Sequence, residues 1–216
     1  MDTTSVEEAP EFAPAVIDSL RTPLESGTVQ INRSDGAARY PARFQLILAA
    51  NPCPCGMAAT PGVSCQCAPM AVRRYAEKIS RPIRDRIDIN QAFLPLRRAY
   101  LKAALQRSEA SSVVAQRVAE ARQRQLRRLT GTGWRTNGEV SGTYLRRHLP
   151  LPAGLQDVDE AYERGRLSAR GVDKVLRLSW TVADLAGRER PGRDEVAIAL
   201  AMRRGEQPGA AVRGVG

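Results

Sequence analysis

The segment 44–50 is a short apolar run, interrupted only by Gln45, that ends at Asn51 and Pro52. A run of this length that stops at a proline is typical of a strand buried on both faces of a sheet. Open α/β sheets bind ligands at the carboxyl ends of their strands. The run therefore predicts an α/β core and makes Asn51 a candidate site residue. The alternative is that Asn51 only forms a turn ahead of Pro52.

Neighbouring patterns fill out this N-terminal α/β part. Apolar residues at helical spacing predict a helix over 12–23. Alternation in 28–33, followed by the turn signal Ser34-Asp-Gly36, predicts a hairpin over 27–43. A basic helix is expected at 71–80. Pro95 then interrupts the chain and predicts a domain boundary near 94–98.

Beyond that boundary the patterns are helical. Helices are expected at about 112–129, 155–165, 168–187 and 194–203. Ser168 is the expected N-cap of the strongest of these, and Gly187 ends it. The glycines at 131, 133 and 138 interrupt the pattern. We expect an α/β domain at 1–95, an all-α domain at 96–204 and a frayed tail at 205–216.

Four cysteines fall within fifteen residues, as two Cys-x-Cys pairs: Cys53, Cys55, Cys65 and Cys67. In a reducing compartment such clustering favours a metal site over disulfides, and four thiolates suit one tetrahedral Zn²⁺. Prolines and glycines between the pairs let the loop bring them together. A closed site of this kind is structural, because it leaves no open position for chemistry. A redox pair and unligated thiols remain alternatives.

Charge is distributed unevenly along the 216 residues, whose net charge is +10. Residues 1–26 carry a net −5, whereas 97–148 carry twelve bases and three acids. The basic excess predicts a surface for nucleic acid or another polyanion, with general arginine richness as the alternative. Aromatic residues make up only 5%, which argues against a base-stacking platform and favours phosphate contacts.

No segment approaches the roughly 18 apolar residues that a membrane-spanning helix needs. The acidic first ten residues lack the features of a secretory signal. We therefore expect a cytoplasmic protein without a membrane partner.

Several motifs together resemble the magnesium-chelatase-like AAA+ ATPases of the bacterial ComM/YifB type. The resemblance covers roughly 7–203 and rests on these segments: Glu8-Ala-Pro-Glu-Phe12, Leu20-Arg-Thr-Pro-Leu-Glu25, Ala50-Asn-Pro-Cys-Pro-Cys-Gly56, Cys65-Gln-Cys67, Asp85-Arg-Ile-Asp88 and Thr181-Val-Ala-Asp-Leu-Ala-Gly187. It implies a P-loop NTPase sheet with a hairpin insert, followed by a helical lid. It also implies ATP and Mg²⁺ as cofactors, a homo-oligomeric ring, a hexamer in this family, and a DNA-processing role of the branch-migration helicase type.

The resemblance assigns roles to individual residues. Glu7 and Glu8 match the acidic Walker B pair, in which the first acid holds Mg²⁺ through water and the second orients the attacking water. Asn51 matches the sensor that bonds the γ-phosphate or that water. Arg86 matches the arginine finger offered to a neighbouring subunit, a task that suits a permanently charged guanidinium. Without the motif, the expectation would be that Arg86 only forms a surface ion pair with Asp85 or Asp88.

Four features depart from the family pattern, the first of which is Glu7 in the place of the family's aspartate. The segment 1–6, expected as an apolar strand, is polar. The lid arginine that senses nucleotide falls on Trp180; Arg177, one turn earlier, is a substitute on spacing alone, and the alternative is that the sensor is absent. No GxxxxGK[ST] phosphate loop occurs in the sequence. Because that loop carries most triphosphate binding, we expect a C-terminal fragment of the family that does not hydrolyse ATP alone.

Two functions of different classes follow. The first is part of an AAA+ DNA motor that supplies Arg86 to an intact partner. The second is a non-enzymatic module that binds zinc through its cysteine loop and nucleic acid through its basic lid. Magnesium insertion into a porphyrin follows only from the family name, since nothing in the sequence suggests a tetrapyrrole site.

Overall fold

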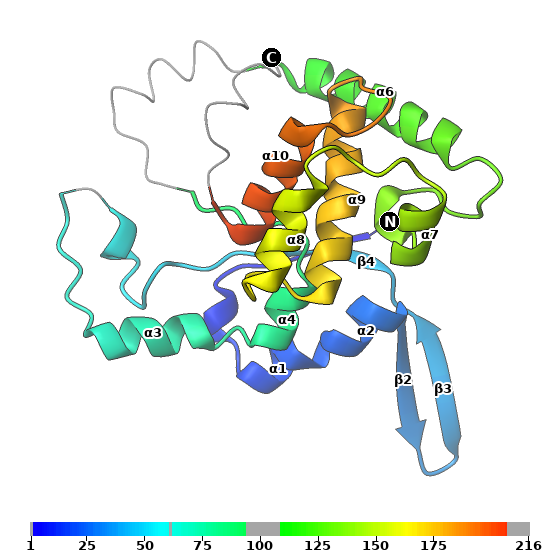
Figure 1. Ribbon diagram of the computed structural model, residues 1–216. Coiled ribbons are helices and arrows are strands. Elements are labelled where there is room, and N and C mark those ends of the chain that lie inside the picture. The colour runs from blue at the N-terminus through cyan, green and yellow to red at the C-terminus, as the bar shows by residue number, and fades with distance from the viewer. Residues whose placement is uncertain (1, 61, 94–108, 207–216) are drawn as a thin grey trace. The chain divides into compact units, whose positions relative to one another are not determined.

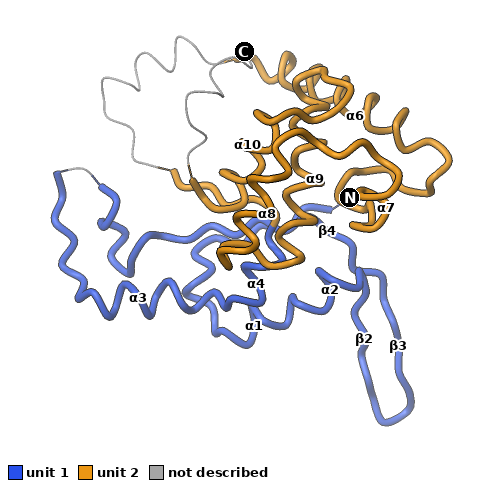
Figure 2. The backbone as a smooth tube through the Cα atoms, viewed as in Figure 1, with its two compact units in different colours: residues 1–87 blue, residues 88–216 orange. Residues whose placement is uncertain are grey.

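The computed structural model describes residues 2–60, 62–93 and 109–206. The chain divides after Ile87 into two compact units, shown in blue and orange in Figure 2. The first unit combines strands with short helices, and the described residues of the second form helices and turns (Figure 1). The expected α/β part followed by an all-α part is therefore confirmed. The boundary expected at 94–98 lies outside the described residues.

The sheet of the first unit pairs β1 (Asp2–Val6) with β4 (Phe44–Leu48) in parallel. β1 forms although its sequence is polar, because the ladder uses backbone groups and not side chains. The expectation that β4 is buried on both faces is wrong. Within the described residues it pairs with β1 alone, and Ile47 is 49% exposed.

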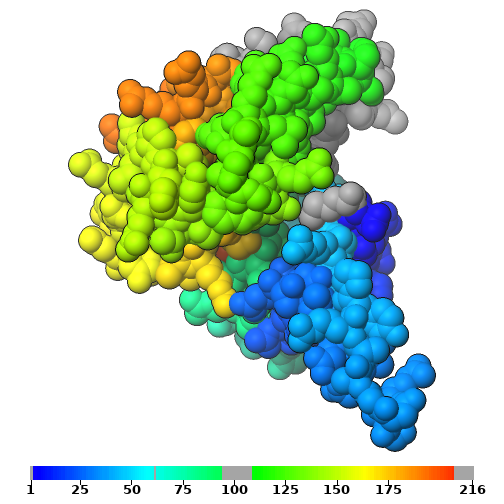
Figure 3. Space-filling model, turned by 90° about the vertical axis from the view of Figure 1, so that its right-hand side faces the viewer, coloured from blue at the N-terminus to red at the C-terminus, as the bar shows by residue number. Residues whose placement is uncertain are grey.

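The predicted hairpin is confirmed as β2 (Thr28–Arg33) paired antiparallel with β3 (Gly36–Pro41). Its residues are exposed along almost its whole length, and Figure 3 shows it projecting from the rest of the blue part of the chain.

The expected helix over 12–23 is two helices, α1 (Pro14–Ser19) and α2 (Arg21–Ser26). Pro23 explains the break, because a proline inside a helix removes one hydrogen bond and clashes with the carbonyl four residues earlier. Restarting the helix at Arg21 places Pro23 in a first turn, where no N–H bond is required. The remaining helices of the unit are η1 (Ala9–Glu11), η2 (Met57–Ala59), α3 (Pro69–Glu77) and α4 (Arg81–Arg86).

The second unit is organised around α9 (Ala169–Leu185), which packs against α10 (Arg193–Arg204) and α6 (Ser111–Arg128). The expected cap is confirmed, since the Ser168 hydroxyl accepts the Gly171 N–H at 3.0 Å. One face of α9 meets α8 (Leu155–Glu163) and α10 through Val175, Val196 and other aliphatic residues. A second cluster joins Leu176 and Trp180 to residues of 129–145.

The sequence patterns missed η3 (Asn137–Glu139), which contains the interrupting Gly138, and α7 (Gly142–Arg147), which follows it. Gly142 is buried at the start of α7, and the Asp173 carboxylate occupies the space that a side chain at this position would need. A side chain at this position would therefore require the Asp173 carboxylate to move.

Across the described ranges, no helix combines the length and apolarity needed to cross a bilayer.

Candidate functional site

The two acids and the asparagine singled out from the sequence lie at one edge of the β1–β4 sheet. Val6 is in register with Leu48 at the carboxyl ends of these parallel strands. The backbone pairing continues past the strands, with Ala49 N–H donating to Val6 at 2.9 Å and Ala9 N–H donating to Ala49 at 2.9 Å. Glu7 and Glu8 on one segment and Asn51 on the other therefore leave the sheet side by side.

All three side chains at this edge are exposed. Glu8 also has a left-handed backbone, with φ of 51° and ψ of 41°, at the start of η1. It is the one non-glycine residue with positive φ in the described chain. Such a conformation costs about 1–2 kcal/mol in a residue with a Cβ, and strained residues of this kind concentrate at functional sites.

Arg86 lies at a different place in the same unit. Its guanidinium forms an ion pair with Glu25 of α2 and donates to the Pro82 carbonyl at 2.9 Å. Its side chain is only 12% exposed. Arg86 and Glu25 help to line an open pocket of about 390 Å³, together with Asp18, Arg21, Thr22 and Ser26. Neither Glu7, Glu8 nor Asn51 lines that pocket, so the structure does not bring Arg86 into one site with them.

If Arg86 had only a structural role, the sequence would pair it with Asp85 or Asp88. The partner that the structure shows is Glu25, which is 61 residues away in the sequence. Asp88 contacts Lys174 at 2.6 Å instead. Sequence reasoning missed Glu25, because a contact between α2 and α4 leaves no trace in local spacing.

Arg177 and Trp180 both lie on α9 and both have structural contacts. Arg177 Nε donates to the Val140 carbonyl at 2.8 Å, which ties α9 to the end of η3. Trp180 is 2% exposed and belongs to the hydrophobic core of its unit. A nucleotide contact from Arg177 stays a prediction.

A buried charge network that the sequence patterns also missed lies next to Trp180. The Asp184 carboxylate accepts hydrogen bonds from both terminal nitrogens of Arg128, at 2.6 Å, and from Asn137 Nδ2, at 3.0 Å. The Arg128 guanidinium lies 4.3 Å from the centre of the Trp180 ring. Local spacing carries no signal for this network, since Asp184 lies off the apolar stripe of the expected helix at 168–187 and its partner Arg128 is 56 residues away on α6. A buried acid needs a cationic partner, and that partner is visible only in the fold.

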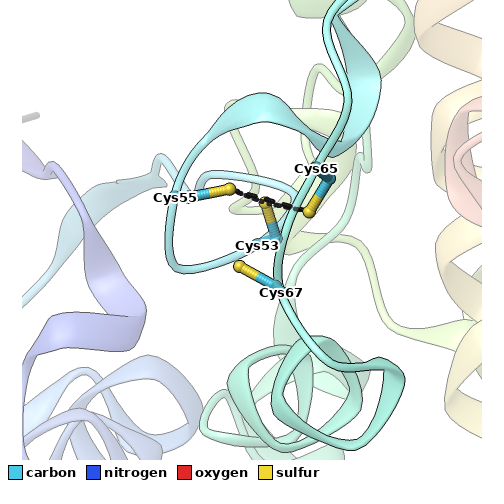
Figure 4. A group of neighbouring side chains, drawn as sticks. All are labelled: Cys53, Cys55, Cys65 and Cys67. Atoms are coloured by element: carbon cyan, nitrogen blue, oxygen red, sulfur yellow. Dashed lines mark hydrogen bonds between the residues drawn. The ribbon is translucent and has the colours of Figure 1, made fainter.

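The four cysteines converge on one point, as Figure 4 shows. Their sulfur atoms all lie within 4.8 Å of one another. Cys53 Sγ is 3.4 Å from Cys55 Sγ and 3.6 Å from Cys65 Sγ, and Cys55 and Cys65 are 3.6 Å apart. A tetrahedral Zn²⁺ with Zn–S bonds of about 2.3 Å sets its sulfurs about 3.8 Å apart. The observed separations are close to this value, and none of the four forms a disulfide.

Within this cluster the thiol of Cys53 is the first to ionise. Burial opposes its ionisation, but the Ala58 N–H and the Cys55 and Cys65 thiols donate to its sulfur and lower its pKa to about 6. A backbone hydrogen bond at Cys67 favours the Cys65 thiolate, but burial and the neighbouring sulfurs outweigh it and raise the Cys65 pKa to about 12. A cation at the centre would favour the thiolate at all four positions.

Known proteins match this chain along most of its length. Residues 4–100 match the family model described as magnesium chelatase, subunit ChlI, and residues 108–203 match the model of the ChlI C-terminal part. An uncharacterized protein of Mycobacterium tuberculosis is 48% identical over 92% of this chain. The competence protein ComM of Haemophilus influenzae and the uncharacterized protein YifB of Salmonella typhimurium are each 32% identical over 92% of it. The aligned part is 39% of the Mycobacterium protein and 38% of the other two, so the chain spans about two fifths of these relatives.

Proposed function

Because this chain belongs to the magnesium-chelatase-like family that includes ComM and YifB, we propose that it forms part of an ATP-driven ring that processes DNA. The observation that carries the proposal is the parallel pairing of β1 with β4. This pairing sets Glu7, Glu8 and Asn51 at the carboxyl edge of the sheet, where open α/β sheets bind their ligands.

The residues at that edge suit ATP and Mg²⁺. Carboxylate oxygens are hard ligands of the kind that Mg²⁺ prefers, often through water. In the proposed site Glu7 would hold Mg²⁺ through water, Glu8 would orient the water for attack on the γ-phosphate, and Asn51 would donate a hydrogen bond to that phosphate. Glu8 is fixed in its left-handed conformation by the turn into η1, which limits the directions in which its carboxylate points.

Arg86 acts on a different nucleotide, that of a neighbouring subunit. Its separation from the acidic edge fits this role, because an arginine finger works in trans and not at the site of its own chain. Glu25 keeps the guanidinium oriented until a triphosphate competes for it. Arg177 is proposed as a second nucleotide contact from the helical unit.

A mixing experiment tests this proposal. The full chain is added to the Mycobacterium tuberculosis relative in which alanine replaces that protein's own arginine finger, and ATP hydrolysis is measured. Because an arginine finger accelerates phosphoryl transfer by about 10³–10⁵-fold, wild-type chain should restore hydrolysis by at least about tenfold, and Arg86→Ala should not. Arg84→Ala, on the same helix, is the control and should behave as wild type.

The chain alone should not hydrolyse ATP, since its sequence contains no GxxxxGK[ST] phosphate loop. Turnover by the isolated chain that disappears in Asn51→Ala would contradict this part of the proposal.

The cysteine cluster adds a structural Zn²⁺ site to the proposal. Four sulfur atoms within 4.8 Å of one another fit a closed tetrahedral site, which would hold the loop that follows Asn51. Metal analysis of the purified chain should give about one Zn²⁺ per molecule, and Co²⁺ substitution should give the absorption of a tetrahedral thiolate site. Cys53→Ser should lose the metal, whereas the control Met57→Ala should keep it. Full-length chain that stays metal-free after reduction and exposure to Zn²⁺ would favour the redox or unligated alternatives.

The second candidate is a module that binds zinc and nucleic acid without catalysis. The cysteine geometry supports it as well as the first, and it needs neither Arg86 nor the acidic edge. Failure of the mixing experiment, together with zinc and nucleic-acid binding by the chain, would favour this candidate.

A further inference from the structure

Three rings form a row on the second unit, which we call the aromatic row: Trp134, Tyr144 and His148. The Trp134 and Tyr144 rings meet edge to face with centres 4.9 Å apart. The Tyr144 and His148 rings stack with centres 4.5 Å apart and planes inclined by 12°. Trp134 and Tyr144 also pack against the cluster that contains Leu176 and Trp180. The inner end of the row is therefore held by the core.

The outer end of the row is exposed. His148 follows the last turn of α7, is exposed, and has no hydrogen bond from its side chain within the described residues. Tyr144 covers one face of the imidazole, which leaves the other face for solvent or for another flat ring. Because the His148 ring is already held against Tyr144, it loses little conformational freedom when a ligand ring stacks on its other face.

An exposed arginine is the sequence neighbour of the residue at each end of the row. Arg135 follows Trp134 and Arg147 precedes His148; both are exposed, and neither takes part in an ion pair within the described part of the chain. Arg146 differs, because it contacts Asp173 at 2.5 Å.

The arginines of α6 that first suggested a polyanion surface are mostly engaged. Arg117 is paired with Glu109, Arg124 with Glu120 and Arg128 with Asp184. Arg135 and Arg147 are therefore the arginines of this region whose charge remains available to a ligand. α6 contributes less unpaired positive charge to a polyanion surface than its sequence suggests.

We propose that the aromatic row binds single-stranded nucleic acid, with one base stacked on His148 and phosphates contacted by Arg135 and Arg147. This rests on the proposed DNA-processing function and names the residues that make the contact. A base inside a duplex is already stacked on its neighbours and cannot cover His148, whereas an unpaired base can. An acidic peptide would use the arginines but would gain nothing from the ring face.

The aromatic content of 5% argued against stacking. Composition could not show that two of the few aromatic residues line up with the only histidine, because they are separated by up to fourteen positions in the sequence.

Binding is measured with the full chain and a fluorescent oligothymidylate of about 15 nucleotides, without ATP or any relative. The comparison ligands are a duplex of equal length and polyglutamate. Stacking of one base contributes about 1–3 kcal/mol, so His148→Ala should weaken binding about 5- to 150-fold, and His148→Phe should retain it. Arg135→Gln and Arg147→Gln should each lower the salt slope by about 0.7.

Arg190→Gln is the control, since it removes an exposed positive charge from the turn between α9 and α10 and should leave binding nearly unchanged. Circular dichroism confirms that each variant is folded. Stronger binding of duplex or polyglutamate, or equal loss in Arg190→Gln and His148→Ala, would overturn the inference. Because the assay needs no ATP, its outcome is separate from that of the Arg86 experiment.

Discussion

Removal of the Asp184 carboxylate should strongly destabilise the helical unit. Asp184 is 2% exposed and Arg128 is 14% exposed, and the two form a bidentate pair at 2.6 Å. Asn137 donates a third hydrogen bond to the same carboxylate. Through these contacts the pair connects α6, η3 and α9.

The cost follows from what Asp184→Ala leaves behind. The guanidinium of Arg128 would remain between Trp180 and Asn137 without its counter-ion. Breaking a buried ion pair by removing one partner costs about 3–5 kcal/mol, which corresponds to a change of at least about a hundredfold in the unfolding equilibrium. Asp173→Ala on the same helix is the control, because its partner Arg146 is 45% exposed and such surface pairs contribute about 0–1 kcal/mol.

The assay is urea unfolding followed by tryptophan fluorescence. Both tryptophans, Trp134 and Trp180, lie in the second unit, so the signal reports that unit. The double variant Arg128→Met with Asp184→Leu should lose less stability than Asp184→Ala, because it leaves no unpaired charge. A loss below about 1 kcal/mol in Asp184→Ala, or a loss equal to that of Asp173→Ala, would refute the assignment of a buried structural pair.

Three further outcomes are expected. Glu8→Gly should be more stable than Glu8→Ala by about 1 kcal/mol in thermal or urea unfolding, since only glycine adopts the left-handed backbone without strain; equal stabilities would show that the strain is absent. In urea unfolding, Ser168→Ala should lower the free energy of unfolding by about 1 kcal/mol through loss of the α9 cap, whereas Ser168→Asp should keep most of the stability that the cap provides. If the cap has no energetic effect, both variants will be as stable as wild type. Addition of a strong chelator should increase the rate of proteolysis within 53–67 and leave the second unit intact, as followed by mass spectrometry; unchanged cleavage would argue against a metal that holds this loop.

Local signals in the sequence were sufficient for several elements. The serine cap and the glycine stop bracket α9, and the turn Ser34-Asp-Gly36 lies where the hairpin reverses. The apolar run at 44–50 correctly predicted a strand, and two Cys-x-Cys pairs in a proline- and glycine-rich loop predicted that four thiols would converge. In each case the deciding interaction is formed within a few residues of the signal.

Features that depend on distant partners could not be predicted. The burial of β4 depends on which strands pair with it, and the conformation of the Arg86 side chain depends on Glu25 in another helix. The basic charge of 97–148 suggested a single polyanion surface, but α9 supplies the acid that neutralises Arg128. Composition counts charges and does not show which of them are already paired.

The measurement that tests the proposed function most directly is ATP hydrolysis by the mixture of finger-deficient relative and full chain, with Arg86 compared to Arg86→Lys. Lysine preserves the charge and can still pair with Glu25, but it lacks the planar fork with which arginine contacts phosphate. If Arg86 completes a neighbour's ATP site, Arg86→Lys should restore no more hydrolysis than Arg86→Ala while the chain stays as stable as wild type. If lysine restores hydrolysis as well as arginine, or if neither the wild-type chain nor any variant restores it, the assignment of Arg86 as an arginine finger is wrong.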